Sequence, residues 1–139
     1  MNDNDAYLTE LSTAQSGSTI EDNAPNANNP ATFDLVVEAV AGHAVGGSFA
    51  PYTLTITAMD LTAVAPAPAL NPAVPAQTFD GPGGPIWKAN GTDFVSTQKF
   101  PITVPPGVFT GHTLQYTASL VTTNHQIVSI IQSDPFVLV

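Results

Sequence analysis

The stretch Tyr52-Thr53-Leu54-Thr55-Ile56-Thr57-Ala58 decides the fold of this 139-residue chain. Apolar side chains alternate in it with threonines. A strict period of two places one set on a buried face of a β-strand and the other set on its wet face. The β-branched residues also favour an extended backbone. The segment therefore predicts a half-buried strand.

The same alternation recurs on both sides of this segment. Phe33–Ala39 carries Asp34 and Glu38 opposite its apolar odd positions, and Thr113–Val121 alternates in the same way. Within 95–104 the proline at position 101 predicts an edge strand or a bulge, because proline donates no ladder hydrogen bond. Residues 126–132 and 135–139 complete the set of strands. The predicted core residues are Leu35, Leu54, Ile56, Leu114, Tyr116 and Leu120.

Turn signals separate these strands. Asn90-Gly91 is a strong hairpin signal, and Gly42–Gly47 reads as a turn. The Pro/Ala-rich segment 63–76 predicts an extended, polyproline-like loop. About seven short strands without a helical period favour an all-β fold, a sandwich of antiparallel strands over residues 31–139.

The stretch Pro106-Gly107, followed by Leu114-Gln115-Tyr116-Thr117-Ala118, resembles the approach to a late strand of an immunoglobulin-like domain. The resemblance covers the strand rhythm of residues 31–139 and implies an antiparallel sandwich with a tyrosine corner at Tyr116. The chain departs from antibody-type domains because it has no cysteine and Trp87 lacks the flanking cysteine pair. The resemblance implies a fold and no function.

Residues 1–30 differ from the rest and are expected to form an acidic N-terminal arm outside the sandwich. They hold five of the eleven acidic residues and four large apolar residues, Tyr7, Leu8, Leu11 and Ile20. The spacing of the first three also fits one helical turn. The arm is either a disordered tail, because it buries too little apolar area to offset its ordering entropy, or a segment that orders on a neighbouring subunit.

The charge balance excludes some partners. The net charge is −9, with two lysines and no arginine, whereas nucleic-acid binding requires cations that neutralise phosphates. Anionic membrane surfaces are disfavoured for the same reason. No apolar run is long enough for membrane insertion. Residues 1–15 have no basic start and no apolar stretch, so no cleavable signal peptide is expected in them. We expect a virion or an extracellular assembly as the location.

Catalytic, metal and cofactor sites are not expected. His43, His112 and His125 share no ligand spacing, and no nucleophile motif occurs. Asp80, Asn90 and Asp93 offer oxygen atoms for calcium but fit no fixed loop pattern. The glycine loop 80–85 lacks the elements of a phosphate loop. The sequence therefore predicts a protein that is not an enzyme.

Aromatic residues gather around the glycine loop and the Asn90-Gly91 turn: Phe79, Trp87 and Phe94. They form either a platform for a partner or glycan, or a plug of the sandwich end around Trp87. The first functional hypothesis is a structural or assembly subunit, a homo-oligomer or part of a larger assembly, that uses its arm for contacts. The second is a carbohydrate-binding or adhesin-like module, and the third a soluble partner-binding module. The predicted partner-binding residues are Tyr7, Leu8, Leu11, Ile20, Phe79, Trp87 and Phe94.

Overall fold

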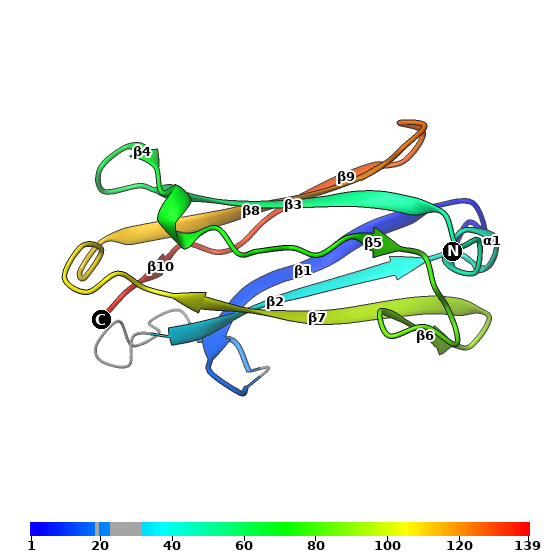
Figure 1. Ribbon diagram of the computed structural model, residues 1–139, viewed down its shortest axis with the longest axis horizontal. Coiled ribbons are helices and arrows are strands. Elements are labelled where there is room, and N and C mark those ends of the chain that lie inside the picture. Colours follow the sequence, from blue (N-terminus) through cyan, green and yellow to red (C-terminus); the bar gives the residue numbers. More distant parts are fainter. Residues whose placement is uncertain (19, 23–31) are drawn as a thin grey trace.

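Two antiparallel sheets pack face to face in the computed structural model, which describes residues 1–18, 20–22 and 32–139 (Figure 1). The all-β sandwich expected from the alternating segments is therefore confirmed. The elements are β1 (Ala6–Gln15), β2 (Thr32–Ala41), α1 (His43–Gly46), β3 (Pro51–Asp60), β4 (Ala65–Pro66), η1 (Pro68–Leu70), β5 (Gln77–Thr78), β6 (Trp87–Asn90), β7 (Asp93–Thr103), β8 (Thr113–Thr122), β9 (Val128–Gln132) and β10 (Phe136–Val137).

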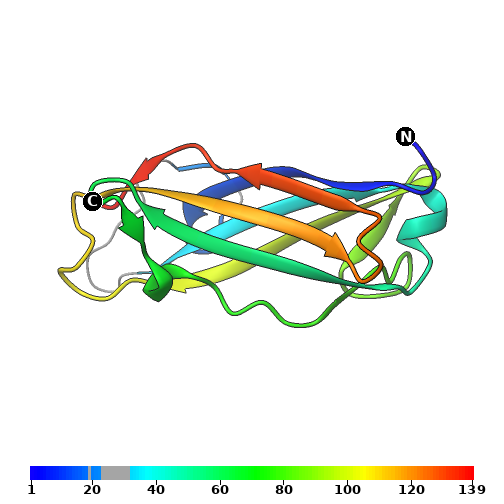
Figure 2. The same cartoon turned by 90° about the horizontal axis from the view of Figure 1, so that it is seen from above.

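Sheet A has four strands in the order β1-β2-β7-β6, and sheet B has six, in the order β10-β8-β3-β4 with β5 paired to β3 and β9 paired to β8. Figure 2 views the molecule from the side of sheet B, with β3, β8 and β9 in front. In sheet A, β6 pairs only with residues 93–96 of β7. Pro101 therefore lies where β7 is an edge, as its missing N–H requires.

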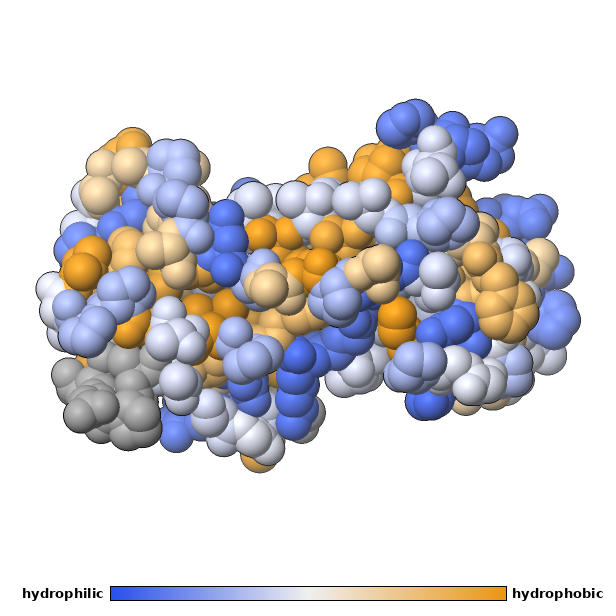
Figure 3. Space-filling view, in the orientation of Figure 1, coloured by the Kyte–Doolittle hydropathy of each residue, from blue (hydrophilic) through white to orange (hydrophobic). Residues whose placement is uncertain are grey.

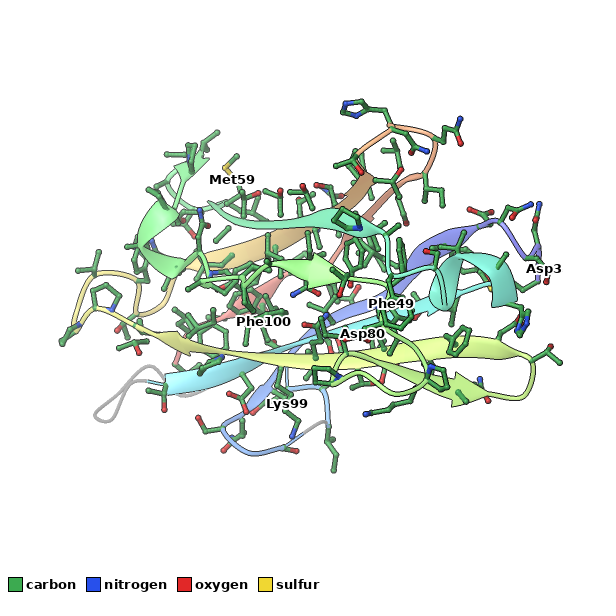
Figure 4. All side chains as sticks on the ribbon, turned by 45° about the vertical axis from the view of Figure 1, so that its right-hand side comes forward. Asp3, Phe49, Met59, Asp80, Lys99 and Phe100 are labelled. Atoms are coloured by element: carbon green, nitrogen blue, oxygen red, sulfur yellow. The ribbon has the colours of Figure 1, made fainter. Side chains whose placement is uncertain are left out.

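The six predicted core residues are all buried between the sheets. Phe100 of β7 lies in the same interior (Figure 4). The rings of Tyr116 and Phe136 stack there with centroids 5.6 Å apart, and Phe33 meets Phe136 edge to face at 5.8 Å. Aromatic pairs at this separation stabilise a core beyond their buried area.

Tyr116 differs from the expected tyrosine corner. Its hydroxyl donates a 2.7 Å hydrogen bond to the carbonyl oxygen of Leu70 in η1, which lies far upstream in the chain. A tyrosine corner closes a local loop a few residues away. The Tyr116 bond instead ties sheet B to the Pro/Ala-rich segment, and burial raises the pKa of the hydroxyl.

The predicted arm is corrected over residues 6–15. These residues form β1, which pairs with β2 along its length from Ala6↔Ala41 to Gln15↔Phe33. Residues 20–22 fold back along β1, where Thr13 Oγ1 donates to the Asp22 carbonyl oxygen at 2.6 Å. The domain boundary expected at residue 30 therefore does not separate an arm from the sandwich. Residues 19 and 23–30 of the expected arm lie outside the described residues.

A β-bulge explains why the alternation of β1 was not recognised. The register with β2 shifts between Leu8 and Glu10, so that Thr9 is an extra residue. One inserted residue reverses whether even- or odd-numbered side chains face inward. The buried leucines are therefore Leu8, before the bulge, and Leu11, after it. Leu8 and Leu11 are three residues apart, and this spacing also fits a helical turn. The helical turn expected from it was wrong, because both residues lie in a bulged strand.

Candidate functional site

The outward surface of sheet B is a regular grid of short uncharged side chains. Each outward row runs across β3, β8 and β9, for example Thr55↔Ser119↔Ile130. All nine positions are exposed or half-buried. We call these nine positions the outer face of sheet B: Thr53, Thr55, Thr57, Thr117, Ser119, Val121, Val128, Ile130 and Gln132.

This face lies between raised turns at the two ends of sheet B (Figure 3) and has an apolar corner. Most of its side chains are β-branched and short, so their tips lie at similar heights above the strands. Val121, Val128 and Ile130 are neighbours, and Ile130 is 67% and Val128 57% exposed. Figure 3 shows hydrophobic surface at the upper edge of the molecule over β9. Adjacent exposed aliphatic residues of this kind are typical of a contact surface.

The outer face of sheet A has the opposite character. Glu10 of β1 lies directly opposite Glu38 of β2, and Lys99 projects from β7. Figure 4 places Lys99 and Met59 on opposite sides of the sandwich. A hydrogen bond with the Glu10 carboxyl, together with burial and the like charge, raises the pKa of Glu38. Glu10, Glu38 and Lys99 therefore give the outer face of sheet A its charge.

The aromatic cluster predicted as a partner site is buried. Trp87 and Phe79 have no exposed surface, and Phe94 is buried as well. The indole Nε1–H of Trp87 donates to the Tyr52 hydroxyl at 3.1 Å, and that hydroxyl donates to Gln77 Oε1 at 2.9 Å. Burial raises the pKa of Tyr52 to about 12. Trp87 thus plugs the end of the sandwich and has no free face for a sugar.

Two glycine segments close over Phe94. A Cβ atom at Gly46 would lie 2.1 Å from the ring, and one at Gly81 would lie 2.5 Å from it. Only glycine allows both backbones to approach the ring this closely. The ring of His43 stacks on it at 6.3 Å. Gly46 and Gly81 therefore serve packing at this end of the sandwich.

Asp80 shapes the glycine loop from within. Its carboxylate accepts hydrogen bonds from the backbone N–H of Trp87 at 2.8 Å and of Ile86 at 3.3 Å. These donors occupy the oxygens that calcium would need. Over residues 1–18, 20–22 and 32–139 no group of three or more acidic or histidine side chains is placed to hold a metal ion.

The four apolar residues of the expected arm separate into two pairs. Leu8 and Leu11 are buried in the core. Tyr7 is 44% and Ile20 79% exposed, so only these two present apolar surface. The structure therefore does not bring the seven predicted partner-binding residues together. The outer face of sheet B was missed as a site, although the alternating threonines of residues 53–57 were its signal.

His112 and Asp60 form an ion-pair contact, with 2.7 Å between His112 Nδ1 and Asp60 Oδ2. Asp60 Oδ1 accepts the Ala63 N–H at 3.0 Å. Burial opposes ionisation of Asp60, but the bonds from His112 and Ala63 outweigh it and lower the pKa of the carboxyl. The pair joins the turn after β3 to the loop before β8.

A recess of about 460 Å³ opens at the sandwich end that holds α1 and the β8–β9 turn. None of its lining residues is charged. Its polar lining residues are Asn4, Ser48, Thr122, Thr123, Asn124 and Gln126, and its apolar lining residues are Val45, Ala50, Pro51, Phe79 and Ile127. The recess is of a size that accepts a small molecule.

No helix among the described residues is long and apolar enough to cross a membrane. Comparisons with protein-family models, with curated proteins and with solved structures find no match to this chain.

Proposed function

We propose that the chain is a non-enzymatic structural module of a virion or extracellular assembly, and that it docks in that assembly through the outer face of sheet B. One observation carries the proposal. The chain has a net charge of −9, yet none of the nine outward positions on β3, β8 and β9 is charged. In a protein this acidic, a face that meets only water can carry charged residues. The core of a protein contact face is depleted of them.

An immunoglobulin-like sandwich is the fold that we propose for this module. The strands can be lettered in chain order: β1 is A, β2 is B, β3 is C, β6 is D, β7 is E, β8 is F and β9 is G, with β4 and β5 as an extra edge beside C. Sheet A then has the order A-B-E-D, and sheet B has G-F-C at its centre. That is the strand order of the immunoglobulin sandwich. This strand order supports the fold, and the fold by itself carries no function.

The test follows the protein in its source. The tagged wild-type chain, Ile130→Lys and the control Thr97→Lys on sheet A are each expressed there, and lysates are separated by gradient sedimentation. Wild type and Thr97→Lys are expected in particles much heavier than one chain. Ile130→Lys is expected in the light fractions, because a charge in an apolar contact is costly. Wild type in the light fractions overturns the proposal.

The recess supports a second candidate, binding of a neutral hydroxyl-rich ligand such as a sugar. Amide and hydroxyl side chains pair with sugar hydroxyls, and an uncharged lining fits an uncharged ligand. We expect NMR shifts at Ser48 and Ile127, which line the recess, on addition of a simple sugar, and loss of these shifts in the double variant Thr123→Ala, Gln126→Ala. Absence of shifts across a sugar panel contradicts this candidate.

A further inference from the structure

We propose that the recess at the α1 end of the sandwich binds a neutral N-acetylated sugar, and that the acetamido group is the part of the ligand that it recognises. This inference rests on the second candidate function, a sugar-binding recess, and names the class of sugar. It follows from the segments that build the recess, from one amide group that the β8–β9 turn holds in place, and from the mixed chemistry of the lining.

The recess lies between segments that are distant in the sequence. The β8–β9 turn forms one side, and the stretch 45–51 from α1 to the start of β3 forms another, while Asn4 and Phe79 complete the lining. Figures 1 and 2 both show the β8–β9 turn, α1 and the N-terminus at the same end of the sandwich. The Val45 N–H donates to the Asp3 carbonyl oxygen at 3.0 Å, which holds the N-terminal segment on α1. Because folding already positions these segments, a ligand has little left to order.

The side chain of Asn124 is fixed by the turn that carries it. Its Oδ1 accepts hydrogen bonds from Thr122 Oγ1 at 2.7 Å and from the Gln126 N–H at 3.1 Å. Thr122 Oγ1 in turn accepts the Ile127 N–H at 3.1 Å. Because Oδ1 is the acceptor in both bonds, Nδ2 is the donor end of the amide. No hydrogen bond among the described residues uses Asn124 Nδ2, so this group is available to a ligand in the recess.

The lining favours a ligand that carries a hydrogen-bond acceptor beside an apolar group. A fixed amide donor suits a carbonyl oxygen, which accepts hydrogen bonds without donating one. Val45, Ala50 and Ile127 offer aliphatic surface in the same recess. A sugar hydroxyl placed against these residues would lose water without gaining a hydrogen bond, which costs free energy, whereas burial of a methyl group is favourable. The acetamido group carries a carbonyl oxygen and a methyl group on one carbon atom.

The remaining polar groups suit the sugar ring. The side chains of Asn4, Thr123 and Gln126 line the recess and make no hydrogen bond within the described part of the chain. Carboxamide and hydroxyl groups pair with ring hydroxyls in either direction. No lining residue is charged and the chain carries −9, so a neutral sugar is favoured over an anionic one. A neutral N-acetylhexosamine meets all of these conditions.

The experiment is an NMR titration of the full chain, with the shifts of Ser48 and Ile127 as the readout. The probes are N-acetylglucosamine and N-acetylgalactosamine, with glucose and galactose as their matched plain sugars. We expect each N-acetylated sugar to bind at least about tenfold more tightly than its plain counterpart. Anionic N-acetylneuraminic acid should bind more weakly than N-acetylglucosamine. Equal affinity of the plain sugars overturns the inference, and tighter binding of the anionic sugar overturns its neutral class.

A matched pair of variants tests the amide donor. Asn124→Asp keeps an acceptor oxygen for Thr122 Oγ1 and the Gln126 N–H but removes the Nδ2 donor, so it should weaken N-acetylglucosamine binding about tenfold. Asn90→Asp adds the same charge in a hairpin turn outside the lining, where Asp-Gly is equally suited, and it should bind like wild type. Unchanged melting of both variants shows that each is folded. Equal affinity of the two variants for N-acetylglucosamine overturns the inference.

A second variant and a second probe separate the methyl group from the sugar ring. Val45→Thr should reduce the preference for N-acetylglucosamine over glucose, because a hydroxyl replaces part of the apolar surface. Nε-acetyllysine carries the acetamido group on an alkyl chain, and it should bind more weakly than N-acetylglucosamine because it lacks the ring hydroxyls. An unchanged preference in Val45→Thr contradicts the methyl contact, and equal affinity for Nε-acetyllysine overturns the assignment to a sugar.

The inference and the candidate function on which it rests fail separately. If plain and N-acetylated sugars shift Ser48 and Ile127 with the same affinity, the recess binds sugars without regard to the acetamido group, and the inference falls while the candidate function stands. If no sugar of either kind shifts these residues, both fall.

Discussion

The two outer faces of the sandwich come from strands of similar length and differ in how they meet solvent. On sheet A, Glu10 and Glu38 oppose each other, while Val36 between Ser12 and Lys99 is almost completely buried. On sheet B the corresponding positions carry mostly hydroxyl groups and aliphatic side chains, which are exposed or half-buried. The alternation within a strand therefore identifies its outward face but not what that face contacts. A charged face favours contact with water, whereas an uncharged face can accept a protein partner.

The largest expected difference is between a buried residue of sheet A and an exposed one of sheet B. Leu11→Ala should lower the free energy of unfolding by about 2–5 kcal/mol, because the cavity lies in the core. Ile130→Ala should change it by less than about 0.5 kcal/mol. Urea unfolding followed by the fluorescence of the buried Trp87 measures both. A small loss of unfolding free energy for Leu11→Ala would contradict the place of β1 in the core and would support a loosely attached arm.

A second effect concerns the carboxylate that sheet B turns inward. Because the folded pKa of Asp60 is lowered, its stabilisation is complete above the unfolded pKa of about 3.9 and is lost as pH falls through the folded value. Asp60→Asn should cost about 1–3 kcal/mol at neutral pH and flatten that acid limb. Unfolding curves between neutral and acid pH test this. Equal acid dependence in the variant and wild type would contradict the assignment.

The smallest effect has the opposite sign and belongs to sheet A. The folded pKa of Glu38 is raised, so the Glu10–Glu38 repulsion is present above that value and is relieved as pH falls through it. Glu38→Gln should stabilise the protein at neutral pH by less than about 0.5 kcal/mol, since the pair is partly solvated. Thermal melts at neutral pH and near pH 4 measure it. A variant less stable than wild type at neutral pH would show that the pair is not repulsive.

Local sequence determined most of the strands. Residues 52–58 alternate without interruption, and the alternation alone predicts β3, its buried face and its threonine face, because each residue of a strand reverses the direction of the next side chain. Asn90-Gly91 predicts its hairpin for a similarly local reason: Gly91 adopts a φ of 65°, which glycine tolerates at no cost. Pro101 likewise predicts a free edge, since it has no N–H to donate.

Tertiary structure alone decided the place of β1 and the character of the outer face of sheet B. The extra residue at Thr9 breaks the period of β1, and only pairing with β2 shows that Leu8 and Leu11 share one core. The aromatic residues around the glycine loop gave no local sign of whether they faced inward, because burial depends on the opposite sheet. The outer face of sheet B joins residues from 53 to 132, and their common lack of charge becomes a surface only when the register brings the three strands together.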